Sequence, residues 1–351
     1  MTGDIGQARS FGRAAWTRRM ALGAMAVALA MLGIYVLFDQ LSPKPASAGG
    51  LPPPSAYVPS PENDAKLHMA IDSVLSFVLL HETGHLLISE FDLPVLGREE
   101  DAADRFAVAT MTINGASKQY EALLPVAAFW DAVHQLQDHY DWSDEHGEPE
   151  QRAFQIFCLV YGSDPDNHDE IARQIGLSPS RRQSCIQEAA KNLKDWLGLL
   201  KPTMNSTLAA NMGIQVPSVA VVYDAVPAGL PENLRAVQNE LRSIAMNEQI
   251  LDVIGEQLTA LKLPHYKQLG NMDIVTVNPN PGIVQHPDPI ADLTSYDFVL
   301  RGDSCLDDNG SPVANAFWSA KSRSLTLCYG LIDQVAQIEK SLIAGFEARK
   351  P

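Results

Sequence analysis

The chain has 351 residues and a formal net charge of −16 at pH 7, enough length for a sizeable core and for one large or two modest domains. The first 48 residues hold five Lys/Arg and two Asp/Glu, so the remainder carries about −19, which is −16 less +3. This acidic balance argues against nucleic acid as a partner and against peripheral binding to anionic lipid.

The N-terminus has the pattern of a targeting segment. Four arginines within residues 1–19 precede an uncharged run of nineteen residues, Met20 to Phe38, long enough to cross a bilayer core. The positive-inside rule keeps the Arg-rich end in the cytoplasm and exports the rest. We therefore predict a cytoplasmic N-terminus at 1–19 and a single transmembrane anchor at 20–38. Cleavage of a signal near residues 46–48 is the alternative, and it would leave a secreted or periplasmic protein.

Residues 39–61 are rich in Pro, Gly, Ser and Ala and predict an extended linker between membrane and domain. The next segment, 62–205, is predicted to be a helical, metal-binding half. Asn63 or Asp64 can cap its first helix, whose apolar residues recur at helical spacing as far as Phe91. Further helices are expected at residues 99–113, 119–140, 152–161, 168–175 and 180–199.

The first of these helices carries HETGH at residues 81–85. A helix repeats every 3.6 residues, so His81 and His85 project from one face and can both reach one metal ion. The carboxylate of Glu82 can lie next to the same ion without being a ligand. The helix around the motif is apolar, and burying His and Glu in such a helix without partners would cost free energy. The pattern predicts one Zn²⁺ ion and a hydrolase in which Glu82 is the general base.

A third ligand is expected from the acidic helix that follows the break at Gly97. Glu100 is the first candidate and Glu99 the alternative. Asp104 lies four residues after Glu100 on the same face, where it can orient a ligand histidine. Two competing interpretations are a core helix without metal and a zinc site that is structural or inactive.

The composition changes after residue 205, and 206–351 predict an α+β half that completes the same catalytic domain. Proline cannot donate a backbone hydrogen bond to a neighbouring strand. Pro217 therefore lies either at the start of the first strand of this half or in a strand at the edge of the sheet. The last two strands are expected to form a hairpin, and a closing helix follows. Strands are predicted at 216–223, 273–277, 295–300, 313–319 and 324–328, with helices at 231–262 and 331–347.

Four cysteines lie on the predicted exported side, where disulfides persist. None belongs to a CxxC pair, which argues against a cysteine metal site. Three pairings are possible, and closeness in sequence favours Cys158 with Cys185 and Cys305 with Cys328.

With these motifs in view, the chain resembles a family of bacterial metallopeptidases, exported proteins of uncharacterised function. The resemblance covers most of residues 62–330. It is carried by HETGH with LPVLGREEDAAD (93–104), DEHGEPEQRAFQIFCLVYGSDP (144–165), LSPSRRQSC (177–185) and SCLDDNGSPVANAFWSAKSRSLTLCYG (304–330). HExxH with a downstream ExxxD is also similar to the thermolysin-like gluzincins, although the gap from His85 to Glu100 is short for that group. The resemblance implies a zincin-like α+β fold, mainly α, whose HExxH helix packs on a small sheet supplied largely by the C-terminal half.

Two features depart from the family pattern. In the family the Asn-Ala…Cys-Tyr element precedes the HExxH helix, whereas here it follows, so the element order is circularly permuted. We therefore expect the strands around Ala314 to Tyr329 to lie within reach of the His81 face. Gly330 stands where the family usually has Glu.

Together these patterns predict a zinc metallopeptidase that hydrolyses peptide or protein substrates outside the cytoplasmic membrane. His146 is the candidate donor to the oxyanion, and Tyr329 is the runner-up. The alternatives are a non-catalytic zincin-fold scaffold of the envelope and an amidase that acts on peptidoglycan stem peptides.

Overall fold

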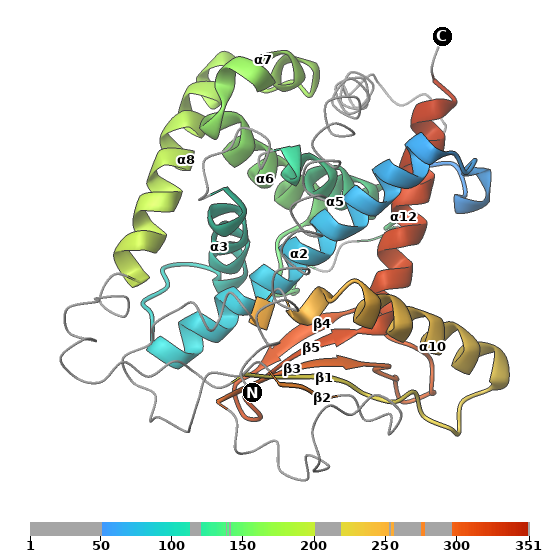
Figure 1. Ribbon diagram of the computed structural model, residues 1–351. Coiled ribbons are helices and arrows are strands. Elements are labelled where there is room, and N and C mark those ends of the chain that lie inside the picture. Colours follow the sequence, from blue (N-terminus) through green and yellow to red (C-terminus); the bar gives the residue numbers. More distant parts are fainter. Residues whose placement is uncertain are drawn as a thin grey trace, which may run out of the picture.

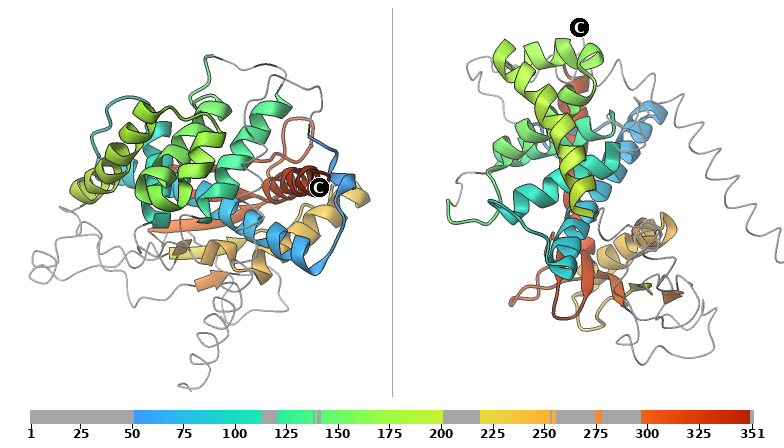
Figure 2. Two further views of the ribbon diagram at one scale, coloured as in Figure 1. Left: turned by 90° about the horizontal axis from the view of Figure 1, so that it is seen from above. Right: turned by 90° about the vertical axis from the view of Figure 1, so that its left-hand side faces the viewer.

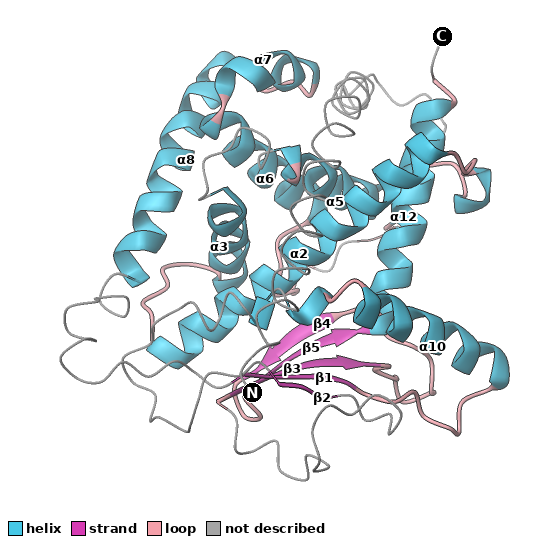
Figure 3. Cartoon of the chain, viewed as in Figure 1, coloured by secondary structure: helices cyan, strands magenta, loops and turns pink. Residues whose placement is uncertain are grey.

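The computed structural model describes residues 51–112, 121–137, 139, 142–200, 219–252, 254–255, 275–277 and 297–349. The predicted anchor at 20–38 and the first part of the predicted linker lie outside these residues. Helices predominate, and a single small sheet lies at one side of them (Figures 1 and 3). The expected organisation, mainly α with a small sheet, is confirmed.

A long helix, α2 (Pro61–Phe91), runs through the middle of the molecule (Figure 1). Its cap is Ser60, whose Oγ accepts a hydrogen bond from the backbone N–H of Asn63 at 3.1 Å. Pro61 fills the first helical position, where a missing N–H costs nothing. The predicted caps Asn63 and Asp64 are therefore wrong, since both lie inside the first turn.

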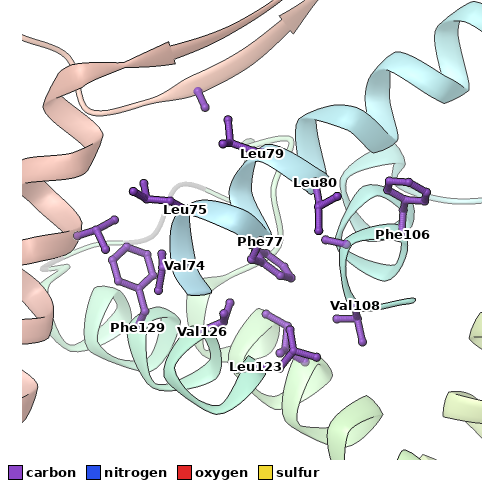
Figure 4. Packing of buried hydrophobic residues seen from close by; sticks show 14 of the residues in the cluster. Val74, Leu75, Phe77, Leu79, Leu80, Phe106, Val108, Leu123, Val126 and Phe129 are labelled. Carbon is purple, nitrogen blue, oxygen red and sulfur yellow. The ribbon is translucent and has the colours of Figure 1, made fainter. Parts of the chain in front are cut away.

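Apolar side chains of α2 form the centre of the hydrophobic core. They pack against α3 (Glu99–Thr112) on one side and α5 (Leu123–Leu136) on the other, as Figure 4 shows. Among the described residues α2 is the one helix long and apolar enough to cross a membrane, but 72% of its most apolar window is buried inside the protein. Each fully buried large aliphatic or aromatic side chain contributes roughly 1.5–3 kcal/mol. The residues in contact include Val74, Leu75, Phe77, Leu79, Leu80, Phe106, Val108, Leu123, Val126 and Phe129.

Three further helices extend this half, with α7 remote from the sheet in both Figure 1 and Figure 2. They are α6 (Pro149–Ser163), α7 (Pro165–Gln174) and α8 (Pro179–Leu200). A disulfide between Cys158 and Cys185 joins α6 to α8, and a second joins Cys305 to Cys328 in the other half. Both pairings agree with the prediction from sequence.

All five described strands come from the C-terminal half. They are β1 (Val219–Tyr223), β2 (Val275–Val277), β3 (Phe298–Asp303), β4 (Ala316–Ser319) and β5 (Ser324–Cys328). The order is β2-β1-β3-β5-β4, and all neighbours are parallel except β4 and β5, which form the predicted hairpin. Because β1 lies inside the sheet, the sheet-edge alternative drawn from Pro217 is wrong, and the strand starts at Val219.

Two helices complete this half, α10 (Glu232–Asn247) and α12 (Tyr329–Glu347). The predicted helix at 231–262 is interrupted: α10 ends at Asn247, Gln249 takes a left-handed φ of 54°, and helix resumes at residues 250–252 and 254–255, while 256–262 lie outside the described residues. A Cβ at Gly330, in the first turn of α12, would lie 2.5 Å from the carbonyl oxygen of Val313. The glutamate of the family pattern has no room at this position.

The edge strand β4 and the turn after it lie along α2. The indole N–H of Trp318 donates to Ser89 Oγ at 2.9 Å, and Arg323 forms an ion pair with Glu90 at 3.0 Å. These contacts confirm that strands from the far C-terminus lie beside the helix that carries HETGH.

Candidate metal centre

The centre is built where α3 approaches α2 at Gly84. A Cβ at Gly84 would lie 3.0 Å from the Cα of Ala103, so only glycine lets the two backbones come this close without a shift. The approach brings the acidic first turn of α3 onto the face of α2 that carries His81 and His85.

The imidazoles of α2 and a carboxylate of α3 converge on one point. His81 Nε2 lies 3.0 Å from Glu100 Oε2, and His85 Nε2 lies 3.3 Å from the same oxygen. The two Nε2 atoms are 3.2 Å apart. Two ligands of a tetrahedral zinc ion, each about 2.0–2.1 Å from it, are separated by about 3.3–3.4 Å. These two histidines and Glu100 therefore fit a zinc ion in both donor type and spacing.

The opposite ring nitrogen of each histidine is held by a second carboxylate. His81 Nδ1 lies 2.7 Å from Asp104 Oδ1, and His85 Nδ1 lies 2.8 Å from Glu99 Oε1. Metal-binding histidines commonly donate their second N–H to a carboxylate, which fixes the ring and its tautomer. Of the two candidates for third ligand, Glu100 faces the Nε2 atoms, whereas Glu99 contacts His85 Nδ1.

Asp104 is in turn fixed by Arg152 of α6. The guanidinium donates to both carboxylate oxygens, at 2.9 Å from Nε and 2.6 Å from the terminal nitrogen, and it lies 3.6 Å from the ring centre of Trp130. Both Arg152 and Asp104 are 6% exposed. A buried, bidentate pair of this kind holds the carboxylate in one orientation toward His81.

Glu82 lies beside this cluster and is hydrogen-bonded to strand β4 of the sheet. Its Oε2 accepts a hydrogen bond from the backbone N–H of Trp318 at 2.8 Å, and the residue is 7% exposed. Burial raises the pKa of Glu82, against the opposing effect of His81 and His85 and of the Trp318 hydrogen bond. A carboxylate with a raised pKa next to two ring nitrogens is suited to proton transfer.

His146 reaches the same point from the loop between α5 and α6. Its Nε2 lies 3.0 Å from Glu100 Oε2, and its ring stacks on that of His81 with centroids 6.1 Å apart. Asp144 lies 3.0 Å from His146 Nδ1 and accepts the backbone N–H of His146 at 2.9 Å. The sequence analysis missed Asp144, although its position two residues before His146 was the available signal.

Tyr329, the runner-up for the oxyanion donor, faces elsewhere. Its hydroxyl donates to the carbonyl oxygens of Gly302 at 2.9 Å and Asp224 at 3.1 Å, and the side chain is fully buried. The hydroxyl thus contacts backbone groups in β3 and directly after β1, away from the histidines, and this candidate is wrong.

The electrostatics of the cluster favour a bound positive charge. Burial opposes the charged form of His85, but hydrogen bonds that its ring donates to the carboxylates of Glu100 and Glu99 outweigh burial and raise the pKa of His85 to about 9. Burial likewise opposes ionisation of Glu100, yet hydrogen bonds from His146, His81 and His85 hold its pKa well below the usual range. One carboxylate oxygen facing three imidazole nitrogens is an arrangement that a divalent cation can satisfy.

A cleft of about 470 Å³ opens beside the cluster. His81, Glu82, His146 and Arg152 line one part of it. Apolar side chains line much of the remainder, including Val78, Phe129, Trp130, Val133 and Leu331, while Asn315 and Ala316 bring the start of β4 to its wall. Polar and apolar side chains share the lining about equally, and a concave site of this size with convergent polar groups can hold a ligand.

A helix-borne HExxH motif joined by an acidic residue from the next helix is a pattern typical of zinc metallopeptidases. Residues 57–200 match the model of a protein family described as "Putative metallopeptidase". The match includes every residue of the cluster but ends before β1. No curated protein and no solved structure matches the chain significantly.

Proposed function

We propose that the chain is a zinc-dependent metallopeptidase with a zincin-like catalytic domain. In this proposal residues 62–205 supply the metal site and residues 206–351 supply the sheet and part of the cleft. The observation that carries it is the convergence of two Nε2 atoms and one carboxylate oxygen within 3.0–3.3 Å, beside a buried glutamate.

His81, His85 and Glu100 would hold the ion. When bound, zinc polarises a substrate carbonyl and lowers the pKa of a water molecule toward neutrality. Glu82 would act as the general base that takes a proton from the attacking water and as the acid that returns it to the leaving amine. The Trp318 N–H holds Glu82 Oε2, so the carboxylate keeps one orientation while its other oxygen takes the proton.

The oxyanion needs a donor besides the metal, and His146 is placed for this task. Asp144 holds its Nδ1, which leaves Nε2 directed at the metal side of the cleft. Hydrogen bonds aimed at a developing oxyanion typically contribute about 10²–10³ in rate.

The outer edge of β4 offers a binding site for the peptide backbone. Trp318 donates its N–H away from β5 toward Glu82, and Asn315 accepts from Cys328 on the β5 side. Because backbone groups alternate along a strand, those of Ala316 face the cleft with those of Trp318. An extended peptide can therefore add to β4 with its backbone passing His81 and Glu82.

We place this activity outside the cytoplasmic membrane. The two disulfides support an oxidising compartment, and the Arg-rich start with its apolar run at 20–38 supports export on a membrane anchor, with signal cleavage as the alternative.

The proposal is tested by incubating a peptide library and purified peptidoglycan sacculi with the full-length protein in detergent. We expect peptide cleavage that stops on addition of a chelator and in Glu82→Gln, which keeps its zinc because Glu82 is not a ligand. Cleavage of sacculi alone would favour the amidase. Zinc binding with no hydrolysis of either substrate would favour the scaffold and contradict the proposal.

A further inference from the structure

Three histidines in the centre share one arrangement of hydrogen-bond partners. Each has a carboxylate at Nδ1, namely Asp104 for His81, Glu99 for His85 and Asp144 for His146, at 2.7, 2.8 and 3.0 Å. Each turns its Nε2 to one atom, Glu100 Oε2, at 3.0, 3.3 and 3.0 Å. A carboxylate at Nδ1, with Nε2 directed at a common point, is the arrangement of metal-ligating imidazoles.

Hydrogen bonds with two neighbouring residues hold His146 in its position. Arg98, which immediately precedes α3, donates to the carbonyl oxygen of His146 at 3.4 Å. Asp144 accepts both the backbone N–H and the ring Nδ1 of His146. The loop is thus tied to the helix that supplies Glu100. One ligand atom each from His81, Glu100 and His146 lies within 4.8 Å of the others.

We propose that His146 is a fourth, exchangeable ligand of the metal, so that the resting site is closed by four protein side chains. The proposal rests on the zinc site proposed above. A tetrahedral ion with four protein ligands has no position for water or substrate, which is the property that separates structural from catalytic sites. His146 must then turn aside before a peptide binds.

The structure lets His146 leave without disturbing the core. Its side chain is 47% exposed, whereas that of His81 is 4% exposed and that of His85 15%. Turned aside on its loop, the imidazole remains next to the cleft, where it can donate to the oxyanion. One side chain would thus serve as a ligand before substrate binding and as a hydrogen-bond donor after it.

The test measures metal affinity in full-length protein by competition with a chromophoric chelator. His146→Ala should bind zinc at least about tenfold more weakly than wild type, as expected for loss of a group that supports the metal. The matched control is His139→Ala, an exposed histidine of the same loop that lines the same cleft. Its affinity should equal that of wild type, and circular dichroism should show all three proteins equally folded.

A second measurement uses the visible spectrum of the cobalt(II)-substituted protein, with azide as the probe. Wild type and His139→Ala should not respond to azide, whereas His146→Ala should, because a coordination position is open. Equal zinc affinity of wild type and His146→Ala, with an equal azide response, would overturn the role of His146. If zinc is then lost in His81→Ala, the proposed function stands. Failure of wild type to bind zinc would overturn both proposals.

Discussion

A buried carboxyl group in α12 makes the stability of this protein depend on pH in a predictable way. Glu339 is 3% exposed, and among the described residues its Oε1 has no hydrogen-bond partner. Burial raises the pKa of Glu339 from 4.5 to about 8. At neutral pH the folded protein therefore keeps a proton that the unfolded chain has released.

The sign and size of the effect follow from this difference. Between pH 4.5 and 8 the folded state binds more protons than the unfolded state, so the free energy of unfolding falls as pH rises. One pH unit corresponds to about 1.4 kcal/mol for one proton. From pH 5 to pH 7, Glu339 should thus remove about 3 kcal/mol of stability.

Glu339→Gln keeps the size of the side chain and removes the titration. Urea unfolding of the oxidised protein at pH 5, 6 and 7 should show that wild type loses about 3 kcal/mol more than the variant over this range. The control is Asp333→Asn, exposed on the same helix, which should follow wild type. Equal pH dependence in wild type and Glu339→Gln would refute the reasoning.

Two further predictions concern the metal centre. Asp104→Asn should weaken zinc binding by about 10–100-fold in a chelator competition, because His81 loses its carboxylate partner, whereas Asp101→Asn should not. Equal affinities of the two variants would count against the role given to Asp104. Gly84→Ala should lower the stability of the metal-free protein by about 1–3 kcal/mol through its contact with Ala103. Gly198→Ala is the control and should leave the stability unchanged, because a Cβ there meets nothing within 4 Å. If thermal unfolding showed Gly198→Ala to be the less stable of the two variants, the packing argument would be contradicted.

The parts of the centre that could be predicted from sequence are those fixed by local geometry. The four-residue spacing of His81 and His85 places both on one helix face, and the same spacing relates Glu100 to Asp104. A break at Gly97 indicated that a second helix begins there. These local rules were enough to predict that two helices would share one cluster.

The remaining parts depend on contacts between distant segments. Trp318 lies 236 residues from Glu82, and Arg152 lies 48 residues from Asp104. No spacing rule predicts such pairs, because they are set by the packing of whole helices and strands. Glu99 likewise contacts His85 Nδ1 from another helix, and spacing within one helix does not predict such a contact.

The central claim is that this cluster binds zinc, and it is tested most directly by metal analysis combined with zinc-edge X-ray absorption on the purified full-length protein. We predict one zinc per chain with nitrogen and oxygen ligands only, retained in Glu82→Gln and lost in His81→Ala. A protein that takes up no zinc, or one whose zinc content is unchanged in His81→Ala, would contradict the account.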